Sequence, residues 1–334
     1  MMIKKILYRF LVLFAIMLIG YAIYPPFSTG PITLEYPTLE YAGDKLEKII
    51  TERERHVENI KPDNEAQFFW ADSTKSKTEY AIVYLHGFSA SHYEGFPTHI
   101  NIAKRYGMNL FLSRLANHGI SGVESMNDLT ADKLADSAME AIAIGKQMGE
   151  KVILMGCSTG GTVGLMAMAH DPTIEGAILY SPNIELANPA SILIRKPFGK
   201  KLAAMIEGRD HHQIGSLNKL KKYWTNRYRF HGIQVLLDLM AQTMTPKTFQ
   251  KITQPVLSLT YYEDETHQDK VISVEAVEEM MNQIGTPSSK KTFKKLPSVK
   301  AHVMSCELQS SDLEVVFEET VDFIENVMKI APMN

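Results

Sequence analysis

The chain has 334 residues, a length at which α/β proteins often form a single domain with a full hydrophobic core. Hydrophobic residues make up 45% and charged residues 22%, and the formal net charge of −3 gives no basic bias, which argues against a nucleic-acid-binding protein. Two cysteines are too few for a disulfide framework or an all-cysteine metal site, and we expect Cys157 and Cys306 to be free thiols.

An apolar segment begins the chain. Three basic residues precede an unbroken apolar run from Phe10 to Tyr24, which as a helix would span about 22 Å, short of the ~30 Å hydrocarbon core of a bilayer. Snorkelling of the basic side chains would lengthen this span. No A-x-A-like cleavage site follows, so residues 1–24 are predicted to be an uncleaved membrane anchor, with a cleaved signal peptide as the alternative. In either case we expect the rest of the chain on the non-cytoplasmic side, membrane-associated or exported.

Residues 25–64 are polar and are predicted to be a linker and N-terminal extension with one short helix at 44–55. From residue 65 onward, short β-rich runs alternate with longer helical patterns. The predicted strands are 66–71, 81–85, 109–113, 152–155, 176–180, 256–261 and 292–296, and the predicted helices are 97–106, 131–148, 160–170, 274–284 and 313–328. Because apolar strands alternate with helices, we expect an α/β fold with a mostly parallel sheet flanked by helices.

Residues 183–253 break this alternation, because they run about 70 residues without a convincing strand, too long for a plain connection in a compact domain. The helical pattern at 233–244 predicts that the stretch is a helical cap or lid inserted above the carboxyl edge of the sheet. The core would then comprise residues 65–182 and 254–334. Four aromatic residues of the cap are expected to line or cover an apolar pocket rather than bind nucleic acid: Tyr223, Trp224, Tyr228 and Phe230.

The motif G-x-S-x-G occurs at Gly156–Gly160, after the apolar run Val152–Met155 and before a helical pattern. This strand–turn–helix context is the one that the motif requires. A nucleophile on such a sharp turn has strained backbone angles, and side chains two residues before and after it would collide, so glycine is needed there. Ser158 is therefore the candidate nucleophile, and the alternative is a strand that merely ends in a Gly/Ser turn.

A second motif, Leu85-His86-Gly87-Phe88-Ser89, directly follows the strand predicted at 81–85. Here the sequence resembles the α/β-hydrolase superfamily, in which an HG-containing loop after an early strand supplies half of the oxyanion hole. The resemblance implies that the backbone amides of Phe88 and Thr159 are the oxyanion donors. His86 itself is predicted to be structural rather than catalytic.

In this superfamily the nucleophile, the acid and the histidine follow one another along the chain. His302 stands between the strand predicted at 292–296 and the C-terminal helix, which makes it the candidate general base. The acid belongs after the strand at 256–261. Asp269 precedes two apolar residues and a helix start, as in the family, whereas Asp264 stands at the usual distance from the strand. We predict Asp269 as the acid, with Asp264 as the alternative.

Over residues 65–330 the sequence looks most similar to bacterial carboxylesterases and monoacylglycerol-lipase-like hydrolases. The resemblance implies hydrolysis of a small-molecule carboxylic ester through an acyl-enzyme on Ser158, and the apolar cap and membrane segment favour lipophilic acyl esters. A peptidase or amidase with the same triad and a non-catalytic binding protein on a hydrolase scaffold are the alternatives. No cofactor is expected, and Asp210-His211-His212 lacks a third ligand spaced for a metal. The sequence leaves the oligomeric state open.

Overall fold

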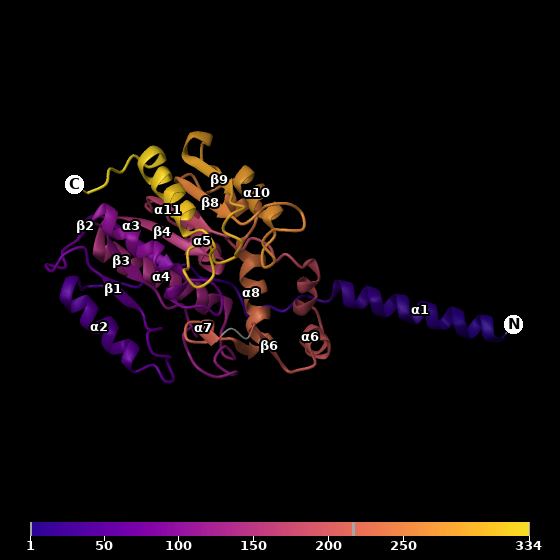
Figure 1. Ribbon diagram of the computed structural model, residues 1–334. Coiled ribbons are helices and arrows are strands. Elements are labelled where there is room, and N and C mark those ends of the chain that lie inside the picture. Colours follow the sequence, from indigo (N-terminus) through magenta and orange to yellow (C-terminus); the bar gives the residue numbers. More distant parts are fainter. Residues whose placement is uncertain (1, 216–217, 334) are drawn as a thin grey trace.

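The computed structural model describes residues 2–215 and 218–333; Met1, residues 216–217 and Asn334, which belong to the predicted N-terminal segment, cap and core, lie outside the described residues. Within these ranges seven strands form one sheet in the spatial order β1-β3-β2-β4-β5-β8-β9 (Figure 1). The strands are β1 (Gln67–Phe69), β2 (Thr78–Leu85), β3 (Asn109–Leu112), β4 (Gly149–Cys157), β5 (Gly176–Tyr180), β8 (Val256–Thr260) and β9 (Lys291–Lys295). Only the edge strand β1 is antiparallel to its neighbour, so the prediction of a mostly parallel sheet is confirmed.

The register of the central strands brings two loops to one edge of the sheet. Leu85 at the end of β2 lies opposite Gly156 of β4, and Cys157 lies opposite Tyr180 at the end of β5. Because these strands are parallel, the segments that follow Leu85 and Cys157 emerge side by side at the carboxyl edge, the edge at which open α/β sheets bind their ligands.

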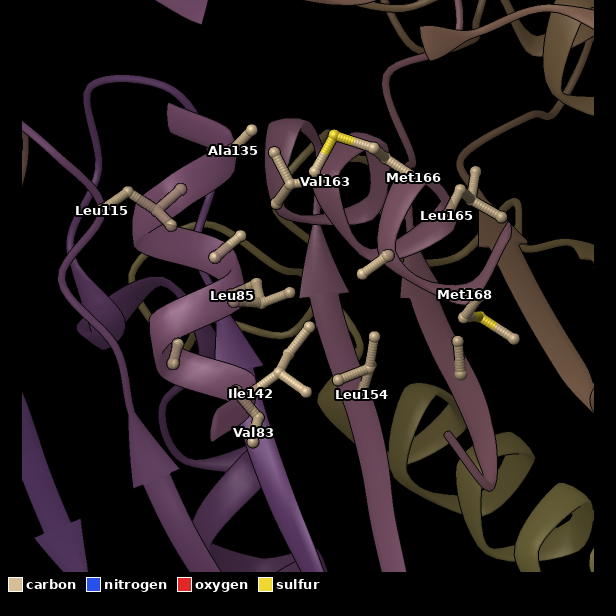
Figure 2. Close-up of a cluster of buried hydrophobic side chains, with 14 of the residues drawn as sticks. Val83, Leu85, Leu115, Ala135, Ile142, Leu154, Val163, Leu165, Met166 and Met168 are labelled. Atoms are coloured by element: carbon tan, nitrogen blue, oxygen red, sulfur yellow. The ribbon is translucent and has the colours of Figure 1, made fainter. Parts of the chain in front are cut away.

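Two clusters of buried apolar side chains cover the two faces of the sheet. Val83 and Leu85 of β2 belong to one cluster, and Ile82 and Tyr84 belong to the other, because successive side chains of a strand point to opposite faces. Figure 2 shows part of the first cluster, where the sheet meets α4 and α5. Complete burial of each large apolar side chain stabilises the fold by about 1.5–3 kcal/mol. The helices that pack on the sheet are α4 (Ala131–Met148), α5 (Thr159–His170) and α10 (Val274–Gln283) on the first face and α3 (Thr98–Tyr106) and α11 (Leu313–Asp322) on the second.

The segment between β5 and β8 has a mixed structure. Its elements are the 3₁₀ helix η2 (Pro189–Arg195), α6 (Gly199–Glu207), β6 (His211–Gln213), α7 (Asn218–Lys221), β7 (Arg227–Arg229), α8 (Phe230–Thr243) and α9 (Pro246–Phe249). β6 and β7 pair antiparallel, with His211 opposite Arg229. The expectation that this stretch contains no strand is therefore wrong. Each strand has only three residues and is mostly polar or charged, so no alternating apolar pattern marks it in the sequence.

The described chain begins with the helix α1 (Met2–Ile23), which projects away from the body of the molecule (Figure 1). Among the described residues, no helix combines the length and the apolar character needed to cross a membrane. The prediction of a transmembrane anchor over residues 1–24 is therefore not supported. The apolar run that begins at Phe10 covers about 21 Å of α1 at 1.5 Å per residue, compared with about 30 Å for a hydrocarbon core.

Polar contacts tie the residues after α1 to the cap. The amide of Phe27 donates to the carbonyl of Arg195 at 2.6 Å, and the Arg195 guanidinium donates back to the carbonyl of Phe27. Asp238 of α8 accepts the amide hydrogen of Thr29 at 2.7 Å and pairs with Arg195 at 3.0 Å. Both members of this ion pair are buried, so the chain is fixed to the cap at the point where α1 begins to leave the molecule.

The helix α2 (Gly43–Arg55) packs Leu46 and Ile50 against the core. The other short elements of the described chain are the 3₁₀ helices η1 (His92–Gly95) and η3 (Ser288–Lys290) and the π-helical η4 (Phe323–Val327), which extends α11. Of these, η1 bears on function, because it lies in the loop that follows β2.

Candidate active site

Ser158 stands on the turn between β4 and α5, with φ of 52° and ψ of −117°. A positive φ is strained for any residue other than glycine, and such strain persists only where the surroundings hold it. The amide of Ser158 donates to the carbonyl of Tyr180, and its carbonyl accepts the amide hydrogen of Asn183, both at 3.0 Å. The end of β5 thus holds the turn, and the serine side chain lies in the wall of a cavity.

Two glycines make this turn possible. A Cβ atom on Gly156 would lie 2.7 Å from the carbonyl carbon of Gly160, and a Cβ atom on Gly160 would lie 1.7 Å from the carbonyl oxygen of Leu85. Both of these neighbours are backbone atoms, which cannot move aside as a flexible side chain could. The glycines of the G-x-S-x-G motif are therefore required by close backbone packing around Ser158.

His302 and Asp269 come from the loops after β9 and β8 and meet at the same cavity. Nδ1 of His302 lies 2.7 Å from Oδ2 of Asp269, while Oδ1 of Asp269 accepts the amide hydrogens of Val271 and Ile272. The Asp269 side chain is fully buried and that of His302 is 14% exposed. Ser158 and His302 both line the cavity, although no hydrogen bond joins their side chains in the part of the chain that the structure describes.

The contact between Asp269 and His302 shifts the pKa values of these two groups in opposite directions. Burial disfavours the charged form of each group, but the charge and hydrogen bond of the partner outweigh it. The pKa of Asp269 is therefore lowered, and the pKa of His302 is raised above its ordinary 6.5. An ionised Asp269 keeps the proton of a neutral His302 on Nδ1, which leaves Nε2 free to accept one.

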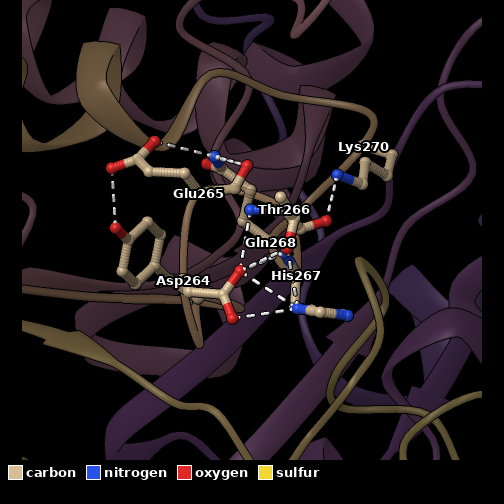
Figure 3. Close-up of polar contacts among 7 residues, drawn as sticks. Asp264, Glu265, Thr266, His267, Gln268 and Lys270 are labelled. Atoms are coloured by element: carbon tan, nitrogen blue, oxygen red, sulfur yellow. Dashed lines mark hydrogen bonds and ion pairs between the residues drawn. The ribbon is translucent and has the colours of Figure 1, made fainter.

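Asp264 lies in the exposed part of the loop that also carries Asp269. Its carboxylate accepts the amide hydrogens of Thr266 and His267 and contacts Nδ1 of His267 at 2.9 Å (Figure 3). The hydrogen bonds from Thr266 and His267 lower the pKa of Asp264. The structure thus brings Asp269 to His302, and it places Asp264 in a separate cluster at the surface.

The loop after β2 runs beside the nucleophile. Among the described residues, neither the Phe88 amide nor the Thr159 amide donates to a protein acceptor. His86 is buried; its Nδ1–H donates to the carbonyl of Gly87 at 2.9 Å, and its Nε2 accepts the Leu115 amide hydrogen at 3.0 Å. Burial lowers the pKa of His86 well below its ordinary value, so the ring is neutral. Since the Gly87 carbonyl and the Phe88 N–H belong to one planar peptide, His86 helps to orient that amide.

Glu94 of η1 also belongs to this site, and no sequence motif indicated it. Its side chain is buried in the cavity wall, and Oε2 accepts the amide hydrogen of Gly87 at 2.5 Å. Burial raises the pKa of Glu94 to about 7, against the opposing effects of the Gly87 amide and His302. A glutamate in a loop after a strand is ordinarily solvated, which is why the sequence alone gave no reason to single it out.

The cavity has a volume of about 580 Å³ and a largely apolar wall that comes mainly from the cap. Trp224, Tyr228 and Phe230 line it, as expected from the sequence, whereas Tyr223 stacks on Tyr93 with ring centroids 3.8 Å apart. Apolar side chains from three cap elements complete the wall: Leu193, Ile194, Leu202, Ala203, Ile206, Ile233 and Leu236. The space suits an apolar chain of a small molecule whose reacting group lies near Ser158.

The acidic groups in the cavity wall are both engaged. Glu94 accepts the amide hydrogen of Gly87, as described above, and Glu207 of α6 lies 2.6 Å from Nδ1 of His212. Further polar side chains of the cap also line the wall, among them Asn188, His212 and Asn226.

Comparison with known proteins places the chain in a family. Residues 76–303, more than half of the chain, match the family described as serine aminopeptidase, S33. No protein of curated function matches the sequence. Solved structures with a similar fold include one reported with the metagenome-derived lipolytic enzymes LipS and LipT, at 19% identity and a TM-score of 0.62, covering 80% of this chain and 99% of that one.

Two further structures are similar over nearly the whole chain. A soluble variant of monoglyceride lipase from Saccharomyces cerevisiae, in complex with a substrate analogue, has 15% identity and a TM-score of 0.56 and covers 92% of this chain and 99% of that one. An esterase from Pyrococcus furiosus has 14% identity and a TM-score of 0.51, covering 90% of this chain and 100% of that one. At such identities the likeness shows the fold alone.

Proposed function

This chain belongs to the serine aminopeptidase S33 family of α/β-hydrolases and is a serine hydrolase, and we propose that it cleaves lipophilic carboxylic esters through Ser158, His302 and Asp269. The observation that carries the proposal is the 2.7 Å contact of His302 with a buried Asp269 in a cavity that Ser158 also lines. A serine, an imidazole and an orienting carboxylate in this chain order are the parts of an acyl-transfer site.

In the proposed reaction Nε2 of His302 takes the hydroxyl proton of Ser158, whose oxygen attacks the ester carbonyl carbon. The carbonyl oxygen becomes an oxyanion that accepts hydrogen bonds from the amides of Phe88 and Thr159. His302 then gives its proton to the departing alcohol, leaving an acyl group on Ser158, and water activated by the same imidazole releases the acid. Asp269 orients the ring and stabilises its charged form throughout.

The wall of the cavity favours an ester with an apolar acyl chain. Apolar side chains of η2, α6 and α8 contribute to this wall, and burial of apolar substrate area would contribute about 25 cal/mol per Å² to binding. An aminopeptidase, the activity in the family description, must bind a free amine, and carboxylates are the groups that do so. Because most of the cavity wall is apolar, ester hydrolysis is favoured over aminopeptidase activity.

A fluorophosphonate probe and a paired substrate panel test this function. The full chain should react covalently with the probe, and Ser158→Ala should abolish both labelling and turnover, by about 10⁴-fold or more for a triad nucleophile. Cys157→Ser, which changes the adjacent residue, should still be labelled. The panel compares p-nitrophenyl esters of rising chain length with aminoacyl anilides. Preferential turnover of the anilides would support the aminopeptidase alternative, and absence of labelling in folded protein would support a non-catalytic binding protein.

We further propose that the N-terminal segment holds the enzyme against a membrane surface, with the catalytic domain on the non-cytoplasmic side. The exposed apolar side chains of α1, among them Phe10 and Leu13, support this, as do the exposed Phe198 and Ile206 of the neighbouring cap. The full chain should float with liposomes, whereas a chain that starts at Phe27 should remain in the aqueous fraction with its esterase activity intact. Equal partitioning of the two chains would contradict the proposal.

A further inference from the structure

Glu94 takes no part in the reaction steps above, yet η1 connects two parts of the site. The Ser305 hydroxyl donates to the backbone carbonyl of Glu94 at 3.2 Å, and the Thr98 hydroxyl donates to the carbonyl of Ser305 at 2.9 Å. The amide of Glu307 donates to the carbonyl of Phe96 at 3.0 Å. The segment around Glu94 is therefore fixed to the stretch that immediately follows His302.

The side chain of Glu94 reaches in the other direction, to the loop beside the nucleophile. Its Oε2 accepts the Gly87 amide hydrogen at 2.5 Å. A Cβ atom on Gly87 would lie 2.7 Å from Oε1 of Glu94 and 3.1 Å from the Cβ atom of Ser158. Gly87 thus lies between the carboxylate and the nucleophile, in a space that no larger residue could occupy without displacing one of them.

Both peptide groups that flank Gly87 are held, one of them by Glu94. The carbonyl of Gly87 accepts hydrogen bonds from His86 and from the Ala90 amide, and this carbonyl shares its peptide plane with the Phe88 N–H. Within the described residues, Glu94 holds the preceding peptide through the Gly87 N–H. Without the carboxylate this N–H would be buried without its acceptor, at a cost that a rotation of the loop could relieve.

We propose that Glu94 is a positioning residue, which fixes the Gly87 peptide so that the Phe88 amide points at the oxyanion formed on attack by Ser158. This inference rests on the ester hydrolysis proposed above. The ionisable groups that face the carboxyl are Tyr84 of β2, Cys157 of β4 and His302. An ionised Glu94 also favours the charged form of His302, so its removal has an electrostatic effect that packing alone would not produce.

The test compares Glu94→Ala and Glu94→Gln with the full chain by kcat, KM and pH profile on one p-nitrophenyl ester. The alanine variant should lose about 10- to 100-fold in kcat with KM changed less than about threefold, because the lost alignment acts on the transition state. The glutamine variant should keep kcat within about threefold, since its amide oxygen can still accept the Gly87 N–H. The acid limb of the pH profile of this variant should move to lower pH, because a negative charge near His302 is gone and the pKa of His302 falls.

Glu307→Gln is the matched control, because this exposed carboxylate accepts a hydrogen bond from the Tyr93 hydroxyl across the same two segments but outside the cavity. It should match the unaltered chain in both kcat and pH profile. A kcat of Glu94→Ala equal to that of the unaltered chain would overturn the positioning role while leaving ester hydrolysis intact. If Glu94→Ala does not fold, a kcat of Glu94→Gln more than about tenfold below that of the unaltered chain would overturn it, because the amide oxygen still offers the Gly87 N–H an acceptor. Failure of the fluorophosphonate to label the unaltered chain would instead reject the proposed function itself.

Discussion

The Oδ2 atom of Asp269 lies 2.7 Å from Nδ1 of His302, while Oδ1 of the same carboxylate accepts the amide hydrogens of Val271 and Ile272. The two oxygens therefore have separate partners, and the backbone of the loop sets the direction in which the carboxylate faces the imidazole. Because the side chain is also fully buried, little conformational freedom remains for it to lose when a substrate binds.

This geometry predicts the effect of removing the charge. Asp269→Asn should lower kcat by about 10³- to 10⁴-fold, since an amide in that position can favour the wrong tautomer of the imidazole. Asp264→Asn is the control, because Asp264 is exposed and contacts His267 instead, and it should change kcat by less than about tenfold. Steady-state hydrolysis of a p-nitrophenyl ester measures both. If the Asp264 variant were the slower one, the acid would be Asp264.

The pH dependence of activity follows from the shift in the pKa of His302. Only the neutral imidazole can accept the serine proton, so activity is complete above this pKa and falls as the pH drops through it. Because Asp269 raises the pKa, the acid midpoint of kcat/KM should lie above the ordinary value of 6.5. In Asp269→Asn the residual activity should show a lower midpoint. A midpoint well below 6.5 in the unaltered enzyme would argue against His302 as the base.

The apolar cavity predicts a dependence on acyl chain length that one cap residue controls. Ala203 of α6 is buried and lines the cavity, whereas its neighbour Ala204 does not. Ala203→Phe should reduce kcat/KM for long-chain esters by about 10-fold or more, and for acetate esters by less than about threefold, because the new ring would occupy cavity space along the cap that a short acyl group does not need. Ala204→Phe should leave the chain-length profile unchanged. A uniform loss across all chain lengths would show that the acyl chain lies elsewhere.

The ion pair between Arg195 and Asp238 predicts a large effect on stability. Asp238→Ala would leave the buried Arg195 guanidinium without its counter-charge and remove the acceptor of Thr29, which should lower the free energy of unfolding by about 3–5 kcal/mol. Glu79→Ala, which breaks an exposed pair with Lys151, should cost no more than about 1 kcal/mol. Chemical denaturation compares the two. Similar values would mean that the buried pair contributes little.

The raised pKa of Glu94 predicts that the stability of the protein also depends on pH. Its pKa is raised to about 7 in the folded protein by burial, above the ordinary 4.5 that the unfolded chain approaches. Between these values the folded protein binds more protons, so the contribution of Glu94 to stability falls as the pH rises through this window. Relative to the unaltered chain, Glu94→Gln should therefore gain stability from pH 4.5 to 7, on the order of 3 kcal/mol at 1.36 kcal/mol per pKa unit. Denaturant titrations measure the free energy of unfolding of both proteins at each pH. If the difference between the two proteins did not change with pH, the raised pKa of Glu94 would be contradicted.

The sequence predicted those parts of the fold that have a strong periodic pattern. The helix at Ala131–Met148 and the strand at Gly176–Tyr180 begin and end at the predicted residues, because their apolar patterns stop sharply at capping or turn residues. The strands β6 and β7 were not predicted, because three residues carry no periodicity. These two segments are strands because they pair with each other, although they are separated along the chain.

The candidate site shows the same division. Ser158 could be proposed as the nucleophile because its turn imposes a local glycine pattern, and His302 as the base because chain order restricts the candidates. Whether Asp269 or Asp264 contacts His302 depends on how the loop folds back, which no local pattern shows. Glu94 has no local signature at all, since its role depends on a loop seven residues away that turns to meet it.

The contact between Phe27 and Arg195 limits how far the N-terminal helix can lie from the cap. α1 ends at Ile23, and Phe27 is bound to the cap. An extended chain between these two residues spans at most about 14 Å. The end of α1 therefore stays within about 14 Å of Phe27. Any surface that binds the helix would therefore also hold the cap, and the cavity that the cap lines, close to that surface.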